Sequence, residues 1–148
     1  MCGIAGVLSL SDAAEPVALA ALNRVRDHMQ ARGPDGAGSW ISQDGRVGLA
    51  HRRLAIIDLS ERGAQPMLAG ELSITFNGEI YNYRALCNAL EQNGERFASD
   101  SDTEVLLKPY MCMGTGMFMA KLDIEGAESL ALRGALKHLA NDQPGTAC

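Results

Sequence analysis

The chain has 148 residues, of which 47% are hydrophobic and 21% charged, and its formal net charge is −5. This length predicts one domain with a substantial hydrophobic core. The acidic balance and the lack of a basic run argue against nucleic acid or an anionic membrane as the main partner. No apolar run approaches the roughly 18 residues of a transmembrane helix, and residues 1–10 lack the basic start of a signal peptide. We therefore expect a cytoplasmic protein.

Short apolar runs and turns fill the first part of the chain and predict strands around one helix. In chain order we expect a strand at 4–10, an amphipathic helix at 16–31, a rigid turn at 32–36, a hairpin whose strands 39–42 and 47–51 flank a turn at 43–45, and a third apolar run at 54–59. The helix prediction rests on Pro16, which suits a first helical turn, and on the apolar residues at helical spacing after it.

A fourth apolar run, at 72–76, precedes two predicted helices. Asn82 is placed to cap a helix over 83–93. Ser101 and Glu104 have the spacing of a capping box at the start of the next helix. Strands with helices before and after them predict an α+β layered domain.

The character of the sequence changes after Leu107. Pro109 falls within about two turns of the helix start, where we expect it to break or kink the helix. Residues 124–139 predict one more helix, and residues 141–148 a frayed end. No strand pattern comparable to that of the first half returns.

The four cysteines form no recognisable framework. They are Cys2, Cys87, Cys112 and Cys148, without CxxC spacing and without histidines at ligand spacing. We therefore expect neither a metal site nor a disulfide framework. In a reducing compartment, Cys87 and Cys112 are most simply small, buried apolar side chains.

Cys2 differs from the other cysteines in its possible reactivity, because it becomes the first residue of the chain if Met1 is removed. A cysteine thiol has a pKa of about 8.5, and an α-amino group one of about 7.7–8.0. Part of the amine is then unprotonated at neutral pH and can take the thiol proton, directly or through one water. Cys2 would then be a nucleophile that needs no catalytic histidine.

Asn77 and Gly78 directly follow the apolar run at 72–76 and allow two interpretations. The Asn77 side-chain amide and the Gly78 backbone N–H can converge as an oxyanion hole, and glycine lets the backbone come close. Alternatively, Asn-Gly between apolar runs is a strong hairpin signal, and taken alone it favours the hairpin. The residues that follow favour a helix over a matching strand.

Two charged residues also have a functional and an ordinary interpretation. Arg53, just past a strand end, could clamp a substrate carboxylate in a bidentate fork, or it could be a surface arginine. Asp102 could bind a substrate ammonium, or it could supply negative charge at a helix N-terminus.

Six motifs occur together in one order, and the set is more specific than any member. They are MCGIAGVL at the start, RGPDG at 32–36, AHRRLAIIDLS at 50–60, GAQPM at 63–67, FNGEIYNYRAL at 76–86 and SDTEVLL at 101–107. The set resembles the N-terminal glutaminase domain of glutamine-hydrolysing asparagine synthetases, which are class II glutamine amidotransferases of the N-terminal-nucleophile hydrolase fold. The resemblance covers residues 1–107. It implies a sandwich of two antiparallel sheets between helical layers.

The resemblance also implies the chemistry. Cys2 would attack the side-chain amide of glutamine and form a glutamyl thioester, with its own α-amine as the base. Asn77 and Gly78 would form the oxyanion hole. Ammonia would leave for a second domain, where ATP activates aspartate, and water would release glutamate.

Other matching residues would bind the substrate. Arg53 would hold the glutamine α-carboxylate, and Asp102 and Glu79 its α-amino group. The main-chain groups that would line the site belong to Leu54, Ala55, Ile56 and Ile57.

We expect residues 108–148 to depart from the family as a divergent tail, and we expect no synthetase domain. The strands that complete the sheets in the family have no counterpart here, so we expect a sandwich that is incomplete at its C-terminal end and marginally stable. The chain itself is expected to need no cofactor, because ATP and magnesium belong to the synthetase domain.

The expected partners are glutamine as substrate and either a separate synthetase subunit or a second copy of the chain docked through exposed sheet. The alternative is a truncated or frame-shifted, non-catalytic fragment that acts at most as an interaction module. The two readings differ in whether the thiol reacts with a glutamine-analogue electrophile.

Overall fold

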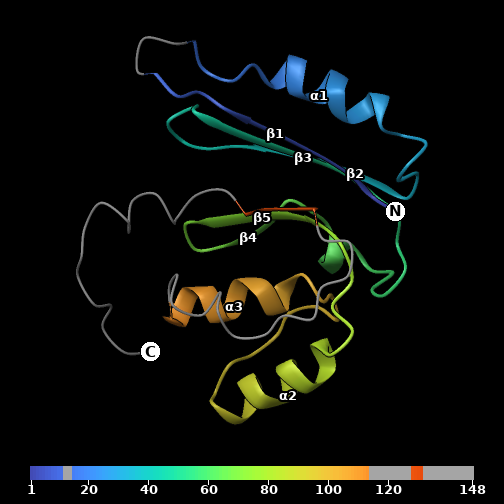
Figure 1. The fold of residues 1–148 in the computed structure, drawn as a ribbon, viewed down its shortest axis with the longest axis vertical. Helices are drawn as coiled ribbons and strands as arrows, with labels where there is room; N and C mark the ends of the chain where they lie inside the picture. Colours follow the sequence, from blue (N-terminus) through green and yellow to red (C-terminus); the bar gives the residue numbers. More distant parts are fainter. Residues whose placement is uncertain (12–14, 114–127, 132–148) are drawn as a thin grey trace.

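In the part of the chain that the structure describes, two antiparallel sheets lie face to face, with helices on their outer sides (Figure 1). The computed structural model describes residues 1–11, 15–113 and 128–131. The first sheet consists, in spatial order, of β1 (Gly3–Leu8), β3 (Val47–Arg53) and β2 (Gly36–Ile41). The second consists of β4 (Met67–Ala69), β5 (Leu72–Asn77) and β6 (Glu128–Ala131). The helices are α1 (Leu19–His28), α2 (Tyr83–Gln92) and α3 (Glu104–Met113), with a short 3-10 turn η1 (Glu61–Gly63).

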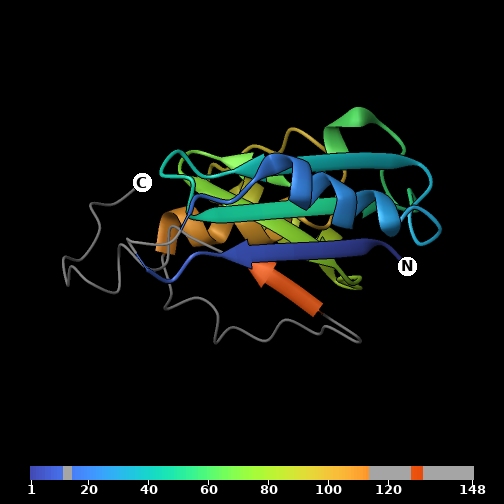
Figure 2. The same ribbon diagram turned by 90° about the horizontal axis from the view of Figure 1, so that it is seen from above.

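Strand β3 is the centre of the first sheet and is covered on both faces. Helix α1 runs across one face (Figure 2), and β5 of the second sheet contacts β3 from the other side. Val47 and Leu49 are therefore 0% exposed. An antiparallel strand usually buries alternate residues, whereas β3 is buried continuously from Val47 to Arg52.

The pairing of β1 with β3 determines where the N-terminus lies. Gly3 stands opposite Arg52 in this antiparallel pair. Cys2, just before β1, and Leu54, just after β3, therefore lie at the same end of the sheet. Figure 1 shows the N-terminus at this end, beside the chain that leads to the second sheet.

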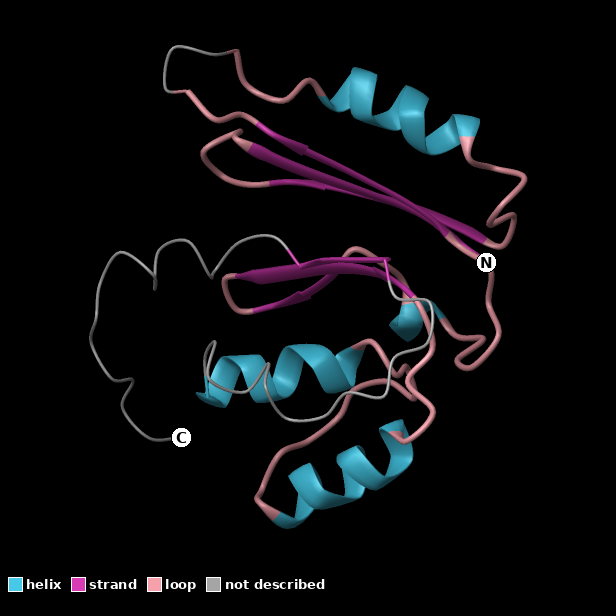
Figure 3. Cartoon of the chain, viewed as in Figure 1, coloured by secondary structure: helices cyan, strands magenta, loops and turns pink. Residues whose placement is uncertain are grey.

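The second sheet packs its outer face on α3, with α2 beyond it (Figure 3). Its core is a cluster of four buried apolar residues, Ile74, Phe76, Ile80 and Leu107. Alternate residues of β5 point to the same face, so Ile74 and Phe76 meet the helix together. The core thereby fixes the strand end that carries Asn77.

The structure has the α+β class and the antiparallel sheets that the sequence predicts, and the hairpin of β2 and β3 is confirmed. The first helix is shorter than the predicted range of 16–31. The Val17 N–H donates to the Gly45 carbonyl oxygen at 2.8 Å, which ties this segment to the β2–β3 turn and leaves the helix to begin at Leu19.

The hairpin that Asn77-Gly78 favours when taken alone does not form, because the chain enters helix α2 at Tyr83, as the residues after Gly78 favour. One prediction for this part of the chain is wrong. Ser101 and Glu104 do not form a capping box, since the Glu104 carboxylate accepts the N–H groups of Ala98 and Ser99 instead.

The apolar run at 54–59 is a loop rather than a strand. Its first two N–H groups bond to side chains, that of Leu54 to Cys2 and that of Ala55 to Asp35. A segment whose backbone donors are engaged in this way cannot join a strand ladder through them.

Predictions for the C-terminal part also need correction. Pro109 does not break α3, which continues to Met113. Burial of Val105 and Leu107 stabilises the turn before the proline. Residues 128–131 form β6, which pairs with Ile74–Asn77 of β5, rather than part of the helix expected over 124–139. A strand therefore does return after Leu107. The remainder of that range and residues 141–148 lie outside the described residues.

The described helices include none that is long and apolar enough to cross a membrane.

Candidate active site

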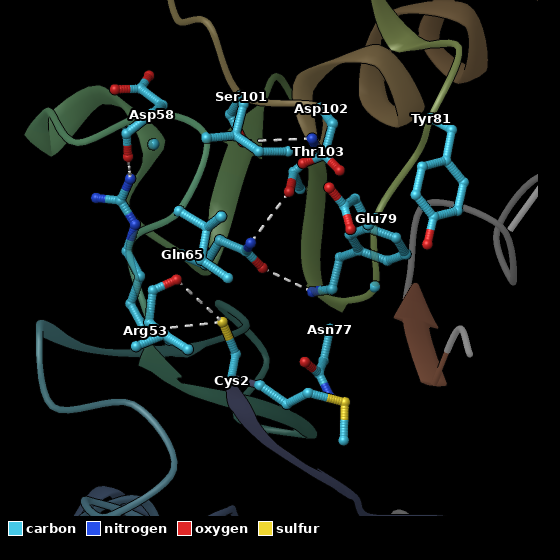
Figure 4. A pocket seen from close by; sticks show the side chains of 17 residues that line it. Cys2, Arg53, Asp58, Gln65, Asn77, Glu79, Tyr81, Ser101, Asp102 and Thr103 are labelled. Atoms are coloured by element: carbon cyan, nitrogen blue, oxygen red, sulfur yellow. Dashed lines mark hydrogen bonds between the residues drawn. The ribbon is translucent and has the colours of Figure 1, made fainter. Parts of the chain in front are cut away.

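A cavity of about 290 Å³ lies where the ends of the two sheets meet (Figure 4). Nine of the ten site residues expected from the sequence line it, namely Cys2, Arg53, Leu54, Ile56, Ile57, Asn77, Gly78, Glu79 and Asp102. The tenth, Ala55, does not line it, and its N–H donates to the Asp35 carboxylate at 2.9 Å. Residues from widely separated parts of the chain thus share one pocket.

Cys2 lies at the outer end of β1 with its thiol in the cavity. The Leu54 N–H donates to its Sγ at 3.3 Å, and Sγ lies 3.7 Å from the Leu54 carbonyl oxygen, to which the thiol donates. An N–H directed at sulfur stabilises the negative charge of a thiolate. Met1 lines the same cavity and is 76% exposed, so it is accessible from solvent.

Asn77 and Gly78 form the wall of the cavity at the end of β5. Asn77 is 8% exposed, and it lines the same cavity as Cys2 (Figure 4). A Cβ at Gly78 would lie 2.6 Å from Cζ of the buried Phe76 ring, closer than real atoms approach. Glycine is therefore the residue that lets the backbone lie against this ring.

The Arg53 guanidinium is engaged by the loop that follows it. It donates to the carbonyl oxygens of Asp58 and Ser60, the latter at 2.7 Å. The Asp58 carboxylate in turn accepts the N–H groups of Ser60 and Asp100. Hydrogen bonding from Ser60 lowers the pKa of Asp58, so this carboxylate is ionised at neutral pH. Arg53 thus has a role in shaping the loop that the sequence does not predict.

Asp102 is a buried acid in the cavity wall. It is 6% exposed, and its Oδ2 accepts the Ile80 N–H at 3.0 Å. Burial raises the pKa of Asp102, and the neighbouring Glu79 raises it further. A cation bound beside the two carboxylates would offset both the cost of burying the Asp102 charge and its repulsion by Glu79. The pair is therefore suited to an ammonium group.

Gln65 and Thr103 also line the cavity but are not among the predicted site residues. The Gln65 Oε1 accepts the Phe76 N–H at 2.6 Å, and its Nε2 donates to Thr103 Oγ1 at 3.0 Å (Figure 4). GAQPM contains Gln65, but the motif itself indicates no chemistry. Only the fold brings it to the site.

A second buried polar contact joins the sheets beneath the site. His51 of β3 is 1% exposed, and its Nδ1 lies 3.0 Å from Thr75 Oγ1 of β5. Burial lowers the pKa of His51 to about 4, so the ring is neutral at neutral pH. Among the residues that the structure describes, no three His, Cys, Asp or Glu side chains form a group that could hold a metal ion.

Comparisons with known proteins identify the family. A family model described as "Glutamine amidotransferase domain" matches residues 1–137, a range that extends past Leu107, where the sequence motifs predict the resemblance to end. Asparagine synthetase [glutamine-hydrolyzing] 1 of Bacillus subtilis (strain 168) is 43% identical over 113 residues, which are 74% of this chain and 17% of the relative.

Two further relatives carry related names. Asparagine synthetase [glutamine-hydrolyzing] 2 of the same organism is 37% identical over 135 residues, 89% of this chain and 17% of the relative. A putative asparagine synthetase [glutamine-hydrolyzing] 2 of Methanocaldococcus jannaschii is 35% identical over 132 residues, 77% of this chain and 24% of the relative. The chain thus spans about a quarter or less of each relative that it matches. It belongs to the glutamine amidotransferase domain family, in the form found in asparagine synthetases.

Proposed function

We propose that this chain hydrolyses glutamine to glutamate and ammonia, as the glutaminase part of asparagine biosynthesis. One observation carries the proposal: a cysteine thiol, an Asn-Gly pair, an arginine and two carboxylates from distant segments line a single cavity. Its volume of about 290 Å³ is near the lower end of the usual size range of small-molecule sites. A nucleophile, oxyanion donors and groups of both charges are what an amide-cleaving site for an amino acid requires.

In the proposed reaction, removal of Met1 frees the α-amine of Cys2. The amine takes the thiol proton, and the thiolate attacks the side-chain carbonyl carbon of glutamine. The Asn77 amide and the Gly78 N–H stabilise the tetrahedral oxyanion. The intermediate collapses to a thioester as the nitrogen takes up a proton and leaves as ammonia. Water then attacks the thioester, which releases glutamate and restores the thiol.

Substrate recognition follows the charges in the cavity. Arg53 binds the glutamine α-carboxylate in our proposal, and Asp102 and Glu79 bind its α-ammonium group. The Arg53 guanidinium has five N–H donors, so contacts to the loop carbonyls leave donors for a carboxylate. Leu54, Ile56 and Ile57 complete the wall on the side of Cys2.

We further propose the N-terminal-nucleophile hydrolase fold, supported by the facing sheets and outer helices (Figure 1). Ammonia would pass to a synthetase domain or a separate synthetase subunit, which would use ATP and magnesium, whereas the glutaminase step uses neither. Cytoplasmic reducing conditions would keep the thiol free. The alternative of a non-catalytic fragment is not favoured, because the family match continues to residue 137.

The test is release of glutamate and ammonia from glutamine by the purified chain. Cys2→Ala is expected to abolish both products. The matched control is Cys87→Ala, which removes the other described free thiol, on α2 and outside the cavity lining, and should retain activity. Equal loss in both variants, or activity that survives Cys2→Ala, would contradict the proposal.

A further inference from the structure

We propose that Gln65 is a positioning residue that fixes the oxyanion-hole strand and the ammonium-binding segment relative to each other. The inference rests on the proposed glutaminase function and adds a residue to it. The side-chain hydrogen bonds of Gln65 go to the backbone of Phe76 and to the side chain of Thr103, so Gln65 acts through these two residues and not on the thiol itself.

The first contact completes the hydrogen bonding of β5. Strands β4 and β5 pair with Met67 opposite Ile74, and the same register continued by two residues brings Gln65 opposite Phe76. The β4 ladder ends at Met67, and the Gln65 side chain supplies the acceptor for the Phe76 N–H instead. Phe76 directly precedes Asn77. The Gln65 amide therefore restrains the strand at the point where the oxyanion donors begin.

The second contact reaches the segment that carries Asp102. Thr103 is 1% exposed, and its hydroxyl oxygen accepts from Gln65 Nε2. The orientation of the Gln65 amide follows from its partners, because a backbone N–H can only donate and must face the amide oxygen. One rigid planar amide thus spans the two walls of the cavity.

The first sheet restrains the backbone of Gln65 as well. A Cβ at Gly38 of β2 would lie 1.9 Å from the Gln65 carbonyl oxygen, so Gln65 rests directly on the β2 backbone. A bridging amide can position its partners only if its own backbone is fixed. Gly38 supplies the close approach that fixes it.

Loss of this amide should therefore change both substrate affinity and turnover. Gln65→Met keeps the length of the side chain but removes acceptor and donor together, and leaves the buried Phe76 N–H without its partner. We expect glutamine binding at least about tenfold weaker and kcat at least about tenfold lower. Thr103→Val removes only the contact to the Asp102 segment. It should weaken glutamine binding about three- to tenfold with kcat largely retained.

The binding experiment is calorimetric titration of glutamine into the Cys2→Ala chain, which cannot turn the substrate over. The titration is then repeated with Gln65→Met, Thr103→Val or Thr103→Ser added to the Cys2→Ala chain. The serine variant keeps the hydroxyl and should restore wild-type affinity. Ser73→Ala is the matched control. It also removes a buried hydroxyl, but one that belongs to β5 and lies outside the cavity lining. Circular dichroism checks that each variant is folded, and kcat and KM are measured in the chain with Cys2 intact.

The outcomes separate this inference from the proposed function. Weaker binding for Gln65→Met and Thr103→Val with rescue by Thr103→Ser supports the inference. Unchanged affinity and kcat in a folded Gln65→Met variant overturns it and leaves the glutaminase proposal standing. If Gln65→Met does not fold, unchanged affinity in Thr103→Val overturns it in the same way. Failure of the Cys2→Ala chain itself to bind glutamine would overturn the proposed function, and this inference with it.

Discussion

The backbone N–H of Leu54 donates a hydrogen bond to the Sγ of Cys2 over 3.3 Å. Cys2 precedes β1 and Leu54 follows β3, so the antiparallel pairing of these strands brings the two residues together. The bond holds the thiol at the cavity wall before any substrate is present. Preorganisation of this kind reduces the entropic part of a reaction barrier.

The proposed oxyanion hole is tested by Asn77→Ala. Because the amide donor acts most strongly on the charge that develops in the transition state, we expect kcat for glutamine to fall by about 10²–10³ while KM changes little. Steady-state glutamate release measures both constants. Asn93→Ala, at the exposed end of α2, is the control and should behave as wild type. A large rise in KM at constant kcat would assign Asn77 to ground-state binding instead.

The role of Arg53 is tested with two substrates, glutamine and its α-carboxamide analogue. The wild-type chain should prefer glutamine, and Arg53→Met should lose most of that preference, because methionine has neither the charge nor the N–H donors that favour a carboxylate over a carboxamide. The comparison separates substrate binding from loop support, since the contacts of Arg53 to Asp58 and Ser60 are present with either substrate.

Arg62→Met is the matched control. Arg62 is an exposed arginine of η1 in the same loop, and its replacement should leave the preference for glutamine over the carboxamide unchanged. Equal weakening of both substrates in Arg53→Met would mean that Arg53 acts only through the loop.

The buried His51 predicts a pH dependence of stability. Burial lowers its pKa to about 4 from an ordinary 6.5. Above pH 6.5 the ring is neutral in both states. Between pH 6.5 and 4 the unfolded chain binds a proton that the folded chain does not, so the free energy of unfolding falls with falling pH, by about 3 kcal/mol in total. Below pH 4 the loss is complete and constant.

Denaturant unfolding of the wild type and His51→Gln at pH 7 and pH 4.5 measures this contribution. The variant should lose less stability between the two pH values, because glutamine does not titrate, and other titrating groups contribute equally to both proteins. His28→Gln, at the exposed end of α1, should follow the wild type. Identical pH dependence in the His51 variant would refute the assignment.

Glu104 is predicted to stabilise the loop before α3. Its carboxylate accepts the N–H groups of Ala98 and Ser99 and the Ser99 hydroxyl, at 2.9, 2.8 and 2.7 Å. Glu104→Ala removes a buried acceptor that serves several donors, and it should lower the free energy of unfolding by about 2–4 kcal/mol. Thermal or denaturant unfolding measures the loss. Glu91→Ala, exposed on α2, should change stability by less than about 0.5 kcal/mol.

Local sequence signals predict the fold where they agree with the packing. The β2–β3 hairpin follows from apolar runs around Gln43–Gly45, and the α2 helix from its apolar spacing. The family resemblance supplied nine of the cavity-lining residues, which composition and spacing alone could not bring together.

The errors arise where contacts distant in the sequence decide the local structure. The run 54–59 has the composition of a strand but becomes a loop, because Cys2, Asp35 and the Arg53 side chain bond to its backbone. β6 is a strand because β5 has an edge to pair with, and its own sequence pattern does not reveal this. Gln65 was missed for the same reason, since its partners Phe76 and Thr103 are distant in the sequence.

The most direct measurement of the central claim is intact-protein and peptide mass spectrometry after incubation with the glutamine-analogue electrophile 6-diazo-5-oxo-norleucine. We predict a chain that lacks Met1 and carries a single adduct, located on Cys2, and we predict that excess glutamine prevents the labelling. A retained Met1, or an adduct on Cys87 with Cys2 unmodified, would contradict the claim that the amine and thiol of Cys2 form the catalytic centre.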